Sequence, residues 1–420
     1  MKQISLGYGS RAVTFDFDEQ RFQIISRIPE AQKTLSDSEI GLALDAPIGS
    51  RLLEDLPAPG ESALIVVSDA TRATGSAQIV NLLVRRLIQA GVPPARMAII
   101  FATGIHRPVT AAETQKLLTS FIVQRLKILA HDAHNLAQMI NLGTTKRGTP
   151  VLVNQALRNF DHVLIVGGIA FHYFAGFTGG RKSICPGLAA AETITATHML
   201  ALDFEKGGRM SGVGPGRLEG NPVHEECDRV AALIQPSFVV NSVVDDKGRP
   251  VKIFAGDWRE AHRQGCQEYG AGHSVEISGK CSLVIVSCGG LPYDLNLIQA
   301  HKALDMAALA CREGGTIVLL AECDDGFGRT DFLKWFEETD SRALENRLLQ
   351  GYEVNGQTAW ALLTKTERFR VILVSELDPD QVRKMKMIPA KSLEEALQQA
   401  PEVEGYLMPQ GATWLPVEKD

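Results

Sequence analysis

Residues 61–108 read ESALIVVSDATRATGSAQIVNLLVRRLIQAGVPPARMAIIFATGIHRP. The run ALIVVS predicts a buried strand, and the segment Gln78–Ala90, which stops at Gly91, has the apolar spacing of a helix. Met97–Ala102 then predicts a second strand. A strand, a helix and a strand at this spacing are typical of a parallel sheet with right-handed crossovers. This stretch therefore predicts an α/β fold.

The alternation of strands and helices continues along the chain. We expect a helix from Ala111 to Leu129, a hairpin in GTTKRGTPVLVN and a strand in DHVLIVGG. Farther on, the pattern predicts a helix from Asn221 to Leu233, a hairpin that turns at residues 246–248, and a helix from Trp258 to Tyr269. The first 50 residues or so predict short strands and a polar helix that carry no chemistry.

A second α/β unit begins near Cys281. CSLVIVSCGG, TIVLLAE and RVILVSE predict strands, and a helix is expected from Asp294 to Arg312, ended by Gly314 and Gly315. The glycine-bearing GAGHS at residues 270–274 marks a boundary. We therefore expect two Rossmann-like α/β domains, residues 1–272 and 273–420, with mostly parallel sheets and the active site in the cleft between them.

The composition is that of an ordinary globular enzyme. The chain has 420 residues, of which 45% are hydrophobic and 22% charged, and its net charge is −6. Because it has neither a long Lys/Arg run nor a window of about 18 uncharged apolar residues, we expect no nucleic-acid or membrane partner. The seven cysteines are scattered and form no CxxC pair. This usage favours a reduced compartment, so we expect a cytoplasmic protein with free thiols.

Polar side chains follow three of the expected strands. Asp69 and Arg72 come after the first strand, His106 after the next, and His172 after DHVLIVGG. The carboxyl ends of parallel strands line the crevice where ligands bind to an open sheet. These four side chains therefore predict a site built by several loops.

The stretch after the third strand, GGIAFHYFAGFTGGRKSICPGLAAAETITATHMLAL at residues 167–202, is the richest in chemical groups. It carries His172, an Arg181-Lys182-Ser183 run, and His198 on a helix expected to start near Leu188. A loop rich in glycine and aromatic residues between a strand and a helix indicates ligand binding.

Several tempting signatures fail their context tests. GFTGGRKS at residues 176–183 is one residue short of a phosphate-binding P-loop and has Arg181 where the motif needs glycine. GVGPG at residues 212–216 lacks the preceding strand and the spacing of a dinucleotide fingerprint. The imidazoles of His106, His172 and His198 could form a zinc site, but no HExxH pattern supports one. We expect no special role for six others. His162 stands at a strand start, and His224, His262 and His273 lie in polar helix or loop contexts. His131 and His134 could form a metal pair, but the pattern favours positions that face solvent.

The second domain contributes one further candidate pair. NLIQAHKALDM places Gln299 and Lys302 three residues apart on one face of a helix, with His301 between them. The pair could be part of a solvated polar face, or it could grip a carboxylate with help from the positive end of the helix dipole. The pattern alone leaves both interpretations open.

Five motifs together resemble the nickel-pincer lactate racemase family, whose members act on 2-hydroxy acids. They are SDATR at residues 68–72, TGIHRP at 103–108, HYFAGFTGGRKSICPG from His172, the helical His198, and QAHK at 299–302. Their order and separation match over most of both expected domains. The resemblance implies a racemase or epimerase that inverts C2 of a 2-hydroxy acid.

The resemblance also implies a cofactor, the nickel-pincer nucleotide, which is a pyridinium mononucleotide whose two thiocarboxylate-type arms hold nickel. In the family, a lysine at the position of Lys182 is joined to one arm through a thioamide, and a histidine at the position of His198 ligates the nickel. Asp69 and Arg72 would contact the phosphate. The further cofactor contacts that the resemblance implies are Ala70, Thr71, Pro186, Gln299, Lys302 and Trp360. Proteins that synthesise the cofactor would be transient partners.

For the reaction, the resemblance implies that His106 and His172 serve as bases, one for the hydroxyl of each enantiomer, because an imidazole titrates near neutrality. Arg72, Gln299, Lys302 and Ile298 would contact the substrate. Lactate-specific members have a tyrosine where this chain has Ile298, and the available Tyr293 lies five residues upstream. The missing phenol favours a larger 2-hydroxy acid or a sugar acid over lactate. The rival interpretations are a carrier of the nickel cofactor and a nicotinamide-dependent dehydrogenase.

Overall fold

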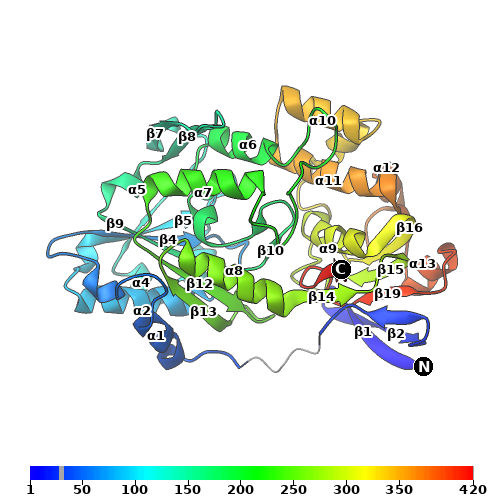
Figure 1. Cartoon of the computed structure of the whole chain (residues 1–420), viewed down its shortest axis with the longest axis horizontal. Coiled ribbons are helices and arrows are strands. Elements are labelled where there is room, and N and C mark those ends of the chain that lie inside the picture. The colour runs from blue at the N-terminus through cyan, green and yellow to red at the C-terminus, as the bar shows by residue number, and fades with distance from the viewer. Residues whose placement is uncertain (28–32, 420) are drawn as a thin grey trace. The chain divides into compact units, whose positions relative to one another are not determined.

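The computed structural model describes residues 1–27 and 33–419, and the chain divides into two compact units (Figure 1). Unit 1 comprises Met1–Ile28, Leu202–Met210 and Gly272–Asp420, and unit 2 comprises Pro29–Ala201 and Ser211–Ala271. The change of unit near residue 272 coincides with GAGHS, but two earlier segments differ from the expected continuous domains 1–272 and 273–420. The N-terminal segment joins unit 1 because β3 (Phe22–Ile24) pairs with β19 (Gly405–Met408). Local patterns do not reveal pairing at such a sequence separation.

Unit 2 is built on a six-stranded sheet in the order β13-β12-β9-β4-β5-β6. All neighbours are parallel except β12 and β13, which form the expected hairpin. The chain builds outward from β4 through β5 to β6, and then continues on the other side of β4 with β9. The topological switch point, where ligands bind in such sheets, therefore lies between β4 and β9. The strands are β4 (Ala63–Ser68), β5 (Met97–Ala102), β6 (Lys127–Leu129), β9 (His162–Gly168), β12 (Phe238–Val244) and β13 (Pro250–Gly256).

Helices and short hairpins complete unit 2. The helices are α1 (Asp37–Asp45), α2 (Ser76–Gln89), α3 (Ala111–Leu117), α4 (Ser120–Val123), α5 (Ala156–Asn159), α6 (Ala191–Met199), α7 (Pro222–Ile234) and α8 (Glu260–His273), with the 3-10 turns η1 (Leu53–Asp55), η2 (Pro94–Arg96), η3 (Leu136–Gln138) and η4 (Gly180–Ser183). The hairpins are β7 (Met139–Thr144) with β8 (Pro150–Asn154), and β10 (Phe171–His172) with β11 (Gly176–Phe177).

The single helix expected from Ala111 to Leu129 was wrong, because this segment forms α3, α4 and β6. The apolar residues Ile128 and Leu129 instead belong to an edge strand, in which Ile128 is opposite Ile99 of β5. Pairing with the sheet therefore overrides the helical spacing of the apolar residues.

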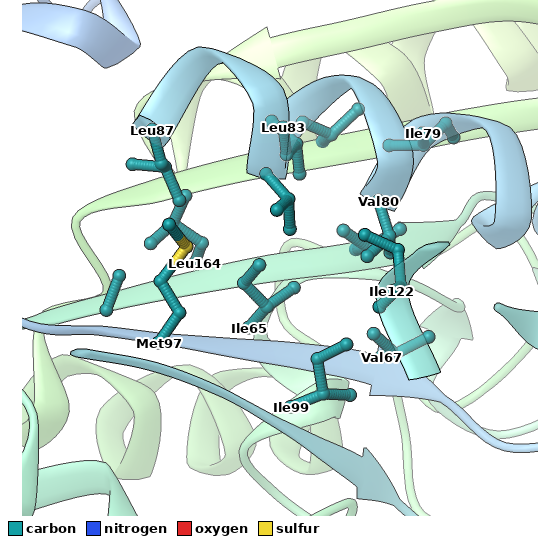
Figure 2. Close-up of a cluster of buried hydrophobic side chains, with 14 of the residues drawn as sticks. Ile65, Val67, Ile79, Val80, Leu83, Leu87, Met97, Ile99, Ile122 and Leu164 are labelled. Atoms are coloured by element: carbon teal, nitrogen blue, oxygen red, sulfur yellow. The ribbon is translucent and has the colours of Figure 1, made fainter. Parts of the chain in front are cut away.

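Helix α2 packs its apolar face against one side of this sheet, as Figure 2 shows. Apolar residues recur at three- and four-residue intervals along α2, which is the spacing of a helix that covers a sheet. The labelled side chains of α2 and the strands that meet in this cluster are all at most 2% exposed: Ile65, Val67, Ile79, Val80, Leu83, Leu87, Met97, Ile99 and Leu164. This close-packed layer holds the ends of β4, β5 and β9 in fixed positions.

Unit 1 contains a second six-stranded sheet, in the order β18-β17-β16-β15-β19-β3, in which all neighbours are parallel. Its topological switch point lies between β15 and β19. The strands are β15 (Cys281–Ser287), β16 (Cys311–Leu320), β17 (Arg370–Val374), β18 (Ile388–Ala390), β19 and β3, with the separate pairs β1 (Lys2–Tyr8) and β2 (Arg11–Phe17), and β14 (Ser274–Ile277) and β20 (Leu415–Glu418). The helices are α9 (Leu297–Ala310), η5 (Phe332–Glu337), α10 (Ser341–Gln350), α11 (Val354–Arg368), α12 (Pro379–Lys384) and α13 (Leu393–Gln399).

The helix expected from Asp294 to Arg312 is shorter at both ends. Asn296 caps α9 by accepting a hydrogen bond from the Gln299 N–H, and β16 begins directly at Cys311. Gly314 and Gly315 therefore lie within β16 and do not end the helix. The parallel α/β fold of both units confirms the predicted fold class. Within the described ranges, no helix is long and apolar enough to cross a membrane, and all seven cysteines are free thiols.

Candidate active site

Asp69 and His106 meet at the carboxyl ends of β4 and β5. Asp69 Oδ2 accepts a hydrogen bond from His106 Nδ1 at 2.7 Å, and Oδ1 accepts two from Thr71, at 2.6 Å from Oγ1 and 3.1 Å from N–H. Asp69 is buried, whereas the His106 side chain is 50% exposed. Because Nδ1 donates its proton to Asp69, the lone pair of the neutral ring lies on the more exposed Nε2. Nε2 is thus the atom at which His106 can accept a proton.

Two opposing effects act on the Asp69 carboxyl. Burial alone would raise its pKa, but the hydrogen bond and charge of His106, with smaller contributions from Thr71 and Arg72, lower the pKa overall. Both oxygens are already bonded, and an ionised carboxylate repels a phosphate. The structure therefore ties Asp69 to His106 and offers no support for the expected phosphate contact. Ala70 and Thr71 line a hollow of about 50 Å³ together with Asp69 and His106.

His172 ends β10 and makes a different hydrogen bond. Its Nδ1 accepts from the N–H of Ala175 at 3.2 Å and of Phe174 at 3.4 Å. A neutral ring with this pattern carries its proton on Nε2. His106 and His172 therefore differ in tautomer: the first presents a lone pair at Nε2, and the second presents an N–H there.

Phe174 brings three expected site residues together, although no sequence motif singled it out. Its ring centroid lies 4.5 Å from that of His172 and 5.1 Å from that of His198, both edge to face. Lys182 Nζ lies 5.3 Å from the same centroid. Phe174 is 5% exposed, so its ring is a buried support between the three polar side chains.

His198 lies in the last turn of α6. Its Nδ1 donates to the Ile194 carbonyl at 2.8 Å, one helical turn earlier, which leaves the lone pair on Nε2. Burial, together with the positive charges of Lys182 and His106, lowers the pKa of His198 to about 3, although the bond to Ile194 acts in the opposite direction. The ring is therefore neutral at physiological pH, as a metal ligand must be.

Lys182 lies in η4, close to two other cations. Burial lowers its pKa well below the usual value, and the charges of Arg72 and Arg181 act in the same direction, against an opposing effect of Cys227. A lysine in such surroundings has a neutral amine fraction that can act as a nucleophile. Pro186, another expected cofactor contact, follows in the same loop after a cis peptide bond.

A buried network, which the sequence patterns did not reveal, holds the loop that carries these residues. Arg181, 1% exposed, donates to the carbonyl of Ala175 at 2.8 Å, and its Nη1 lies 2.9 Å from His262 Nε2. Asn221, the fully buried cap of α7, donates to the Phe174 carbonyl at 2.9 Å. The Asn-Pro pair at 221–222 is a helix-start signal that could have identified this cap, but no local signal points to Arg181.

The solvent-facing position expected for His131 was wrong, whereas His262 has the polar helical setting that was expected, although its ring is buried. His131 is 6% exposed and its Nδ1 pairs with Asn154 Nδ2 at 3.2 Å, and burial lowers its pKa to about 4. His262 is 4% exposed against Arg181. In the part of the chain that the structure describes, no group of three or more His, Cys, Asp or Glu side chains could hold a metal ion, so the open possibility of a three-histidine zinc site has no support.

Gln299 and Lys302 lie on the first turns of α9, as expected. Lys302 Nζ donates to Gln299 Oε1 at 2.6 Å, which confirms that they share one helical face. This bond leaves the amide NH₂ of Gln299 as the end that can donate to a carboxylate. The backbone N–H groups of Leu297 and Ile298 already donate to the carbonyls of Gly326 and Phe327. Any contribution of the helix end is therefore the field of its dipole.

Ile298 and Trp360 are the remaining expected contacts in unit 1. Ile298 is partly exposed beside Gln299. Trp360, on α11, is 3% exposed and its indole N–H donates to Glu345 Oε1 at 2.8 Å. The indole N–H is thus engaged within unit 1, and the role of Trp360 toward a cofactor remains a prediction.

These residues can be compared with known proteins. Residues 8–208 match the lactate racemase N-terminal domain, and residues 277–410 match the lactate racemase C-terminal domain. The chain belongs to the lactate racemase family. It is 32% identical over 406 residues to the lactate racemase of Thermoanaerobacterium thermosaccharolyticum, covering 94% of both chains, and 32% identical over 415 residues to that of Lactiplantibacillus plantarum, covering 96% of both. The predicted family and the predicted isomerase activity of the racemase type are thereby confirmed.

Solved structures agree with this assignment. The lactate racemase apoprotein of Thermoanaerobacterium thermosaccharolyticum matches with a TM-score of 0.90 and 30% identity over 99% of this chain and 100% of that one. A protein of Thermotoga maritima matches with a TM-score of 0.69 and 18% identity over 92% of this chain and 99% of that one, which shows a shared fold.

Proposed function

We propose that this member of the family inverts C2 of a 2-hydroxy acid with a nickel-pincer nucleotide, and that lactate is less favoured than a larger acid. The observation that carries the proposal is the cluster in unit 2, where a carboxylate-paired His106 accompanies the group of His172, Lys182 and His198 around Phe174. A carrier that only stores the cofactor would have no use for a histidine oriented by a buried carboxylate.

The donor set fits the cofactor. His198 offers a neutral Nε2 lone pair, fixed by the bond from Nδ1 to Ile194, which is the arrangement expected of a metal ligand. Lys182 offers an amine that burial keeps partly neutral, which suits a covalent thioamide link. Because one imidazole alone cannot hold the metal, the other ligands would come from the cofactor, whose sulfur and carbon donors suit nickel. When bound, the cofactor would supply an electrophilic carbon that takes up the α-hydrogen as hydride and returns it.

The chain's own residues would handle the hydroxyl proton. His106 accepts it at Nε2, and Asp69 stabilises the resulting imidazolium through the 2.7 Å bond to Nδ1. His172 presents an N–H at Nε2 and can give a proton to the oxygen of the opposite enantiomer. To accept a proton there, His172 must release the amides of Phe174 and Ala175, and these bonds, at 3.4 and 3.2 Å, are long enough to break at little cost. Before the reaction, His106 is therefore ready to accept a proton at Nε2, whereas His172 is ready to donate one there.

The substrate carboxylate would be held by charge and by amide donors. Arg72 follows β4 beside the Asp69 turn, and Gln299 and Lys302 form an oriented pair on α9. Ile298 contributes an apolar side chain without a hydroxyl at the position where, by the family resemblance, lactate-specific members have a tyrosine. A 2-hydroxy acid with a larger substituent at C3 is the substrate class that suits this change.

The test is a screen of enantiopure 2-hydroxy acids with cofactor-loaded protein, followed by the loss of optical purity. The best substrate is then used in single turnovers with His106→Ala and His172→Ala. We expect each variant to reduce the cofactor from only one enantiomer and to produce no inverted product. The absence of any half-reaction would indicate a carrier, and oxo acid released only with added nicotinamide cofactor would indicate a dehydrogenase. Equal loss of the half-reaction from both enantiomers in both variants would refute the two-base assignment.

A further inference from the structure

The N-terminal hairpin of β1 and β2, which is itself part of unit 1, packs at the topological switch point of the six-stranded sheet of that unit. The switch point lies between β15 and β19, and the loop 288–296 leaves the sheet there and leads directly into α9. The turn between β1 and β2, residues 8–11, packs against this loop. A segment that was expected to carry no chemistry therefore packs against the loop that leads into the helix bearing Gln299 and Lys302.

The hairpin and the loop approach each other backbone to backbone. Ser287 Oγ donates to the Gly7 carbonyl at 2.5 Å, and the Leu291 N–H donates to the Gly9 carbonyl at 2.9 Å. A Cβ added at Gly7 would lie 2.4 Å from the carbonyl carbon of Gly289, closer than any real contact of this kind. The hairpin can thus dock only while residue 7 has no side chain.

Asp294 fastens this contact from the inside. Its carboxylate has no exposed surface, and Oδ2 accepts from the N–H of Gly9 at 2.7 Å and of Glu322 at 3.3 Å. Its carbonyl accepts from the Cys323 N–H at 2.9 Å. Among the residues that the structure describes, Oδ1 has no hydrogen-bond partner. Burying a carboxylate while one of its oxygens lacks a hydrogen bond costs free energy of folding, so the presence of Asp294 at this position calls for a specific explanation.

The connection from Asp294 to the substrate helix is short. Asn296, two residues later, accepts from the Gln299 N–H at 3.1 Å and donates to Asp325 Oδ2 at 3.0 Å. Gln299 in turn accepts from Lys302. Only the backbone through Leu295 joins Asp294 to Asn296. Hydrogen bonds at both ends of this short stretch link it to the Gly9 N–H and to the helix that carries the two side chains proposed to hold the substrate carboxylate.

We propose that Asp294 is a positioning residue, which uses the turn of the N-terminal hairpin to fix the first turn of α9 and so aims Gln299 and Lys302 at the substrate carboxylate. This inference rests on the proposed roles of those two residues. We call the hydrogen bond from the Gly9 N–H to Asp294 the anchor. The inference requires that loss of the anchor weakens substrate binding and leaves the chemical step, which residues of unit 2 carry out, largely unchanged.

Three variants test the anchor in the full-length, cofactor-loaded enzyme. Asp294→Ala removes the acceptor, Asp294→Asn keeps an oxygen for the Gly9 N–H, and Gly7→Ala displaces the hairpin without touching Asp294. The matched control is Asp340→Ala, which removes the carboxylate cap of α10, where Asp340 Oδ1 accepts from the Ala343 N–H at 2.8 Å. For each we would measure kcat and KM with the substrate from the screen, and hydrogen exchange of residues 291–303.

We expect Asp294→Ala and Gly7→Ala to raise KM roughly tenfold, as the loss of one hydrogen bond to a charged group would, with kcat within about twofold. Asp294→Asn should restore most of the affinity for the substrate. Gln299→Ala should raise KM less when it is added to Asp294→Ala than when it is made in the wild type. Hydrogen exchange of residues 291–303 should be faster in Asp294→Ala and Gly7→Ala than in the wild type, and it should be unchanged in Asp340→Ala. Unchanged KM, additive effects, or faster exchange throughout unit 1 would overturn the inference. If the wild type racemises no 2-hydroxy acid, the proposed function fails, and hydrogen exchange alone tests the role of Asp294. Faster exchange confined to residues 291–303 in Asp294→Ala and Gly7→Ala would support this role, and unchanged exchange there would refute it.

Discussion

Replacing Asp69 by Asn should disable His106 without removing it. The amide introduced by Asp69→Asn can keep its oxygen toward Thr71, which offers two donors, and this places the NH₂ group where Oδ2 accepts from His106. An NH₂ group must donate, so Nδ1 of His106 becomes an acceptor and the ring proton moves to Nε2. The atom that should accept the hydroxyl proton is then already protonated.

The expected loss of activity follows from the loss of His106 as a proton acceptor. Proton transfer by a positioned base contributes about 10² to 10⁴ in rate, and we expect kcat/KM to fall about 10³-fold, or about 4 kcal/mol in transition-state stabilisation. The free energy of unfolding should fall by only about 1 kcal/mol, because the substitution removes one charge-assisted hydrogen bond to a ring that is 50% exposed. Activity should thus drop far more than stability.

The assay follows racemisation of the best substrate by chiral chromatography, with urea denaturation and ¹⁵N spectra of the histidine rings. Glu61→Gln is a matched control, since Glu61 Oε2 pairs with His162 Nε2 at the same 2.7 Å, but where β9 begins, at the amino end of the sheet. It should lose similar stability and keep its activity. Activity of Asp69→Asn within threefold of wild type, with the His106 tautomer shown to have changed, would refute this reasoning.

Three further predictions concern the cofactor and the stability of unit 1. His198→Ala should lose most of its bound nickel, measured by elemental analysis, while its circular dichroism stays native, because only one ligand-facing ring is removed; full nickel content would remove His198 from the site. Lys182→Ala should show no covalent mass increase in the intact protein, and an adduct mapped to another residue would contradict the tether. Burial would raise the pKa of Asp305, but the charges of Arg209 and Lys365 lower this pKa overall, so it is lower in the folded than in the unfolded protein. The ionised Asp305 therefore stabilises the fold above about pH 4, and this stabilisation is lost at lower pH. Asp305→Asn should therefore cost about 3 kcal/mol in urea denaturation at pH 7 and clearly less near pH 3; an equal cost at both pH values would show that its charge is not responsible.

The sequence alone predicted the strands that build the site in unit 2. Periodicity placed β4, β5 and β9, and because parallel strands end at one edge, Asp69, His106 and His172 could be expected to share that edge. The spacing of Gln299 and Lys302 likewise predicted one helical face, since positions three apart are neighbours on any helix. Such features depend on residues close together in the chain, which is why a sequence pattern can predict them.

The tertiary structure alone decided which groups are paired. Nothing near Asp69 indicates that its carboxylate would bond to a histidine 37 residues away, and nothing near Gly9 indicates an acceptor 285 residues away. The central place of Phe174 depends likewise on how a short hairpin and α6 pack together. Periodicity reports only which face of an element is buried, whereas contacts between distant segments depend on the shapes of the surfaces that meet and on where glycine lets two backbones approach.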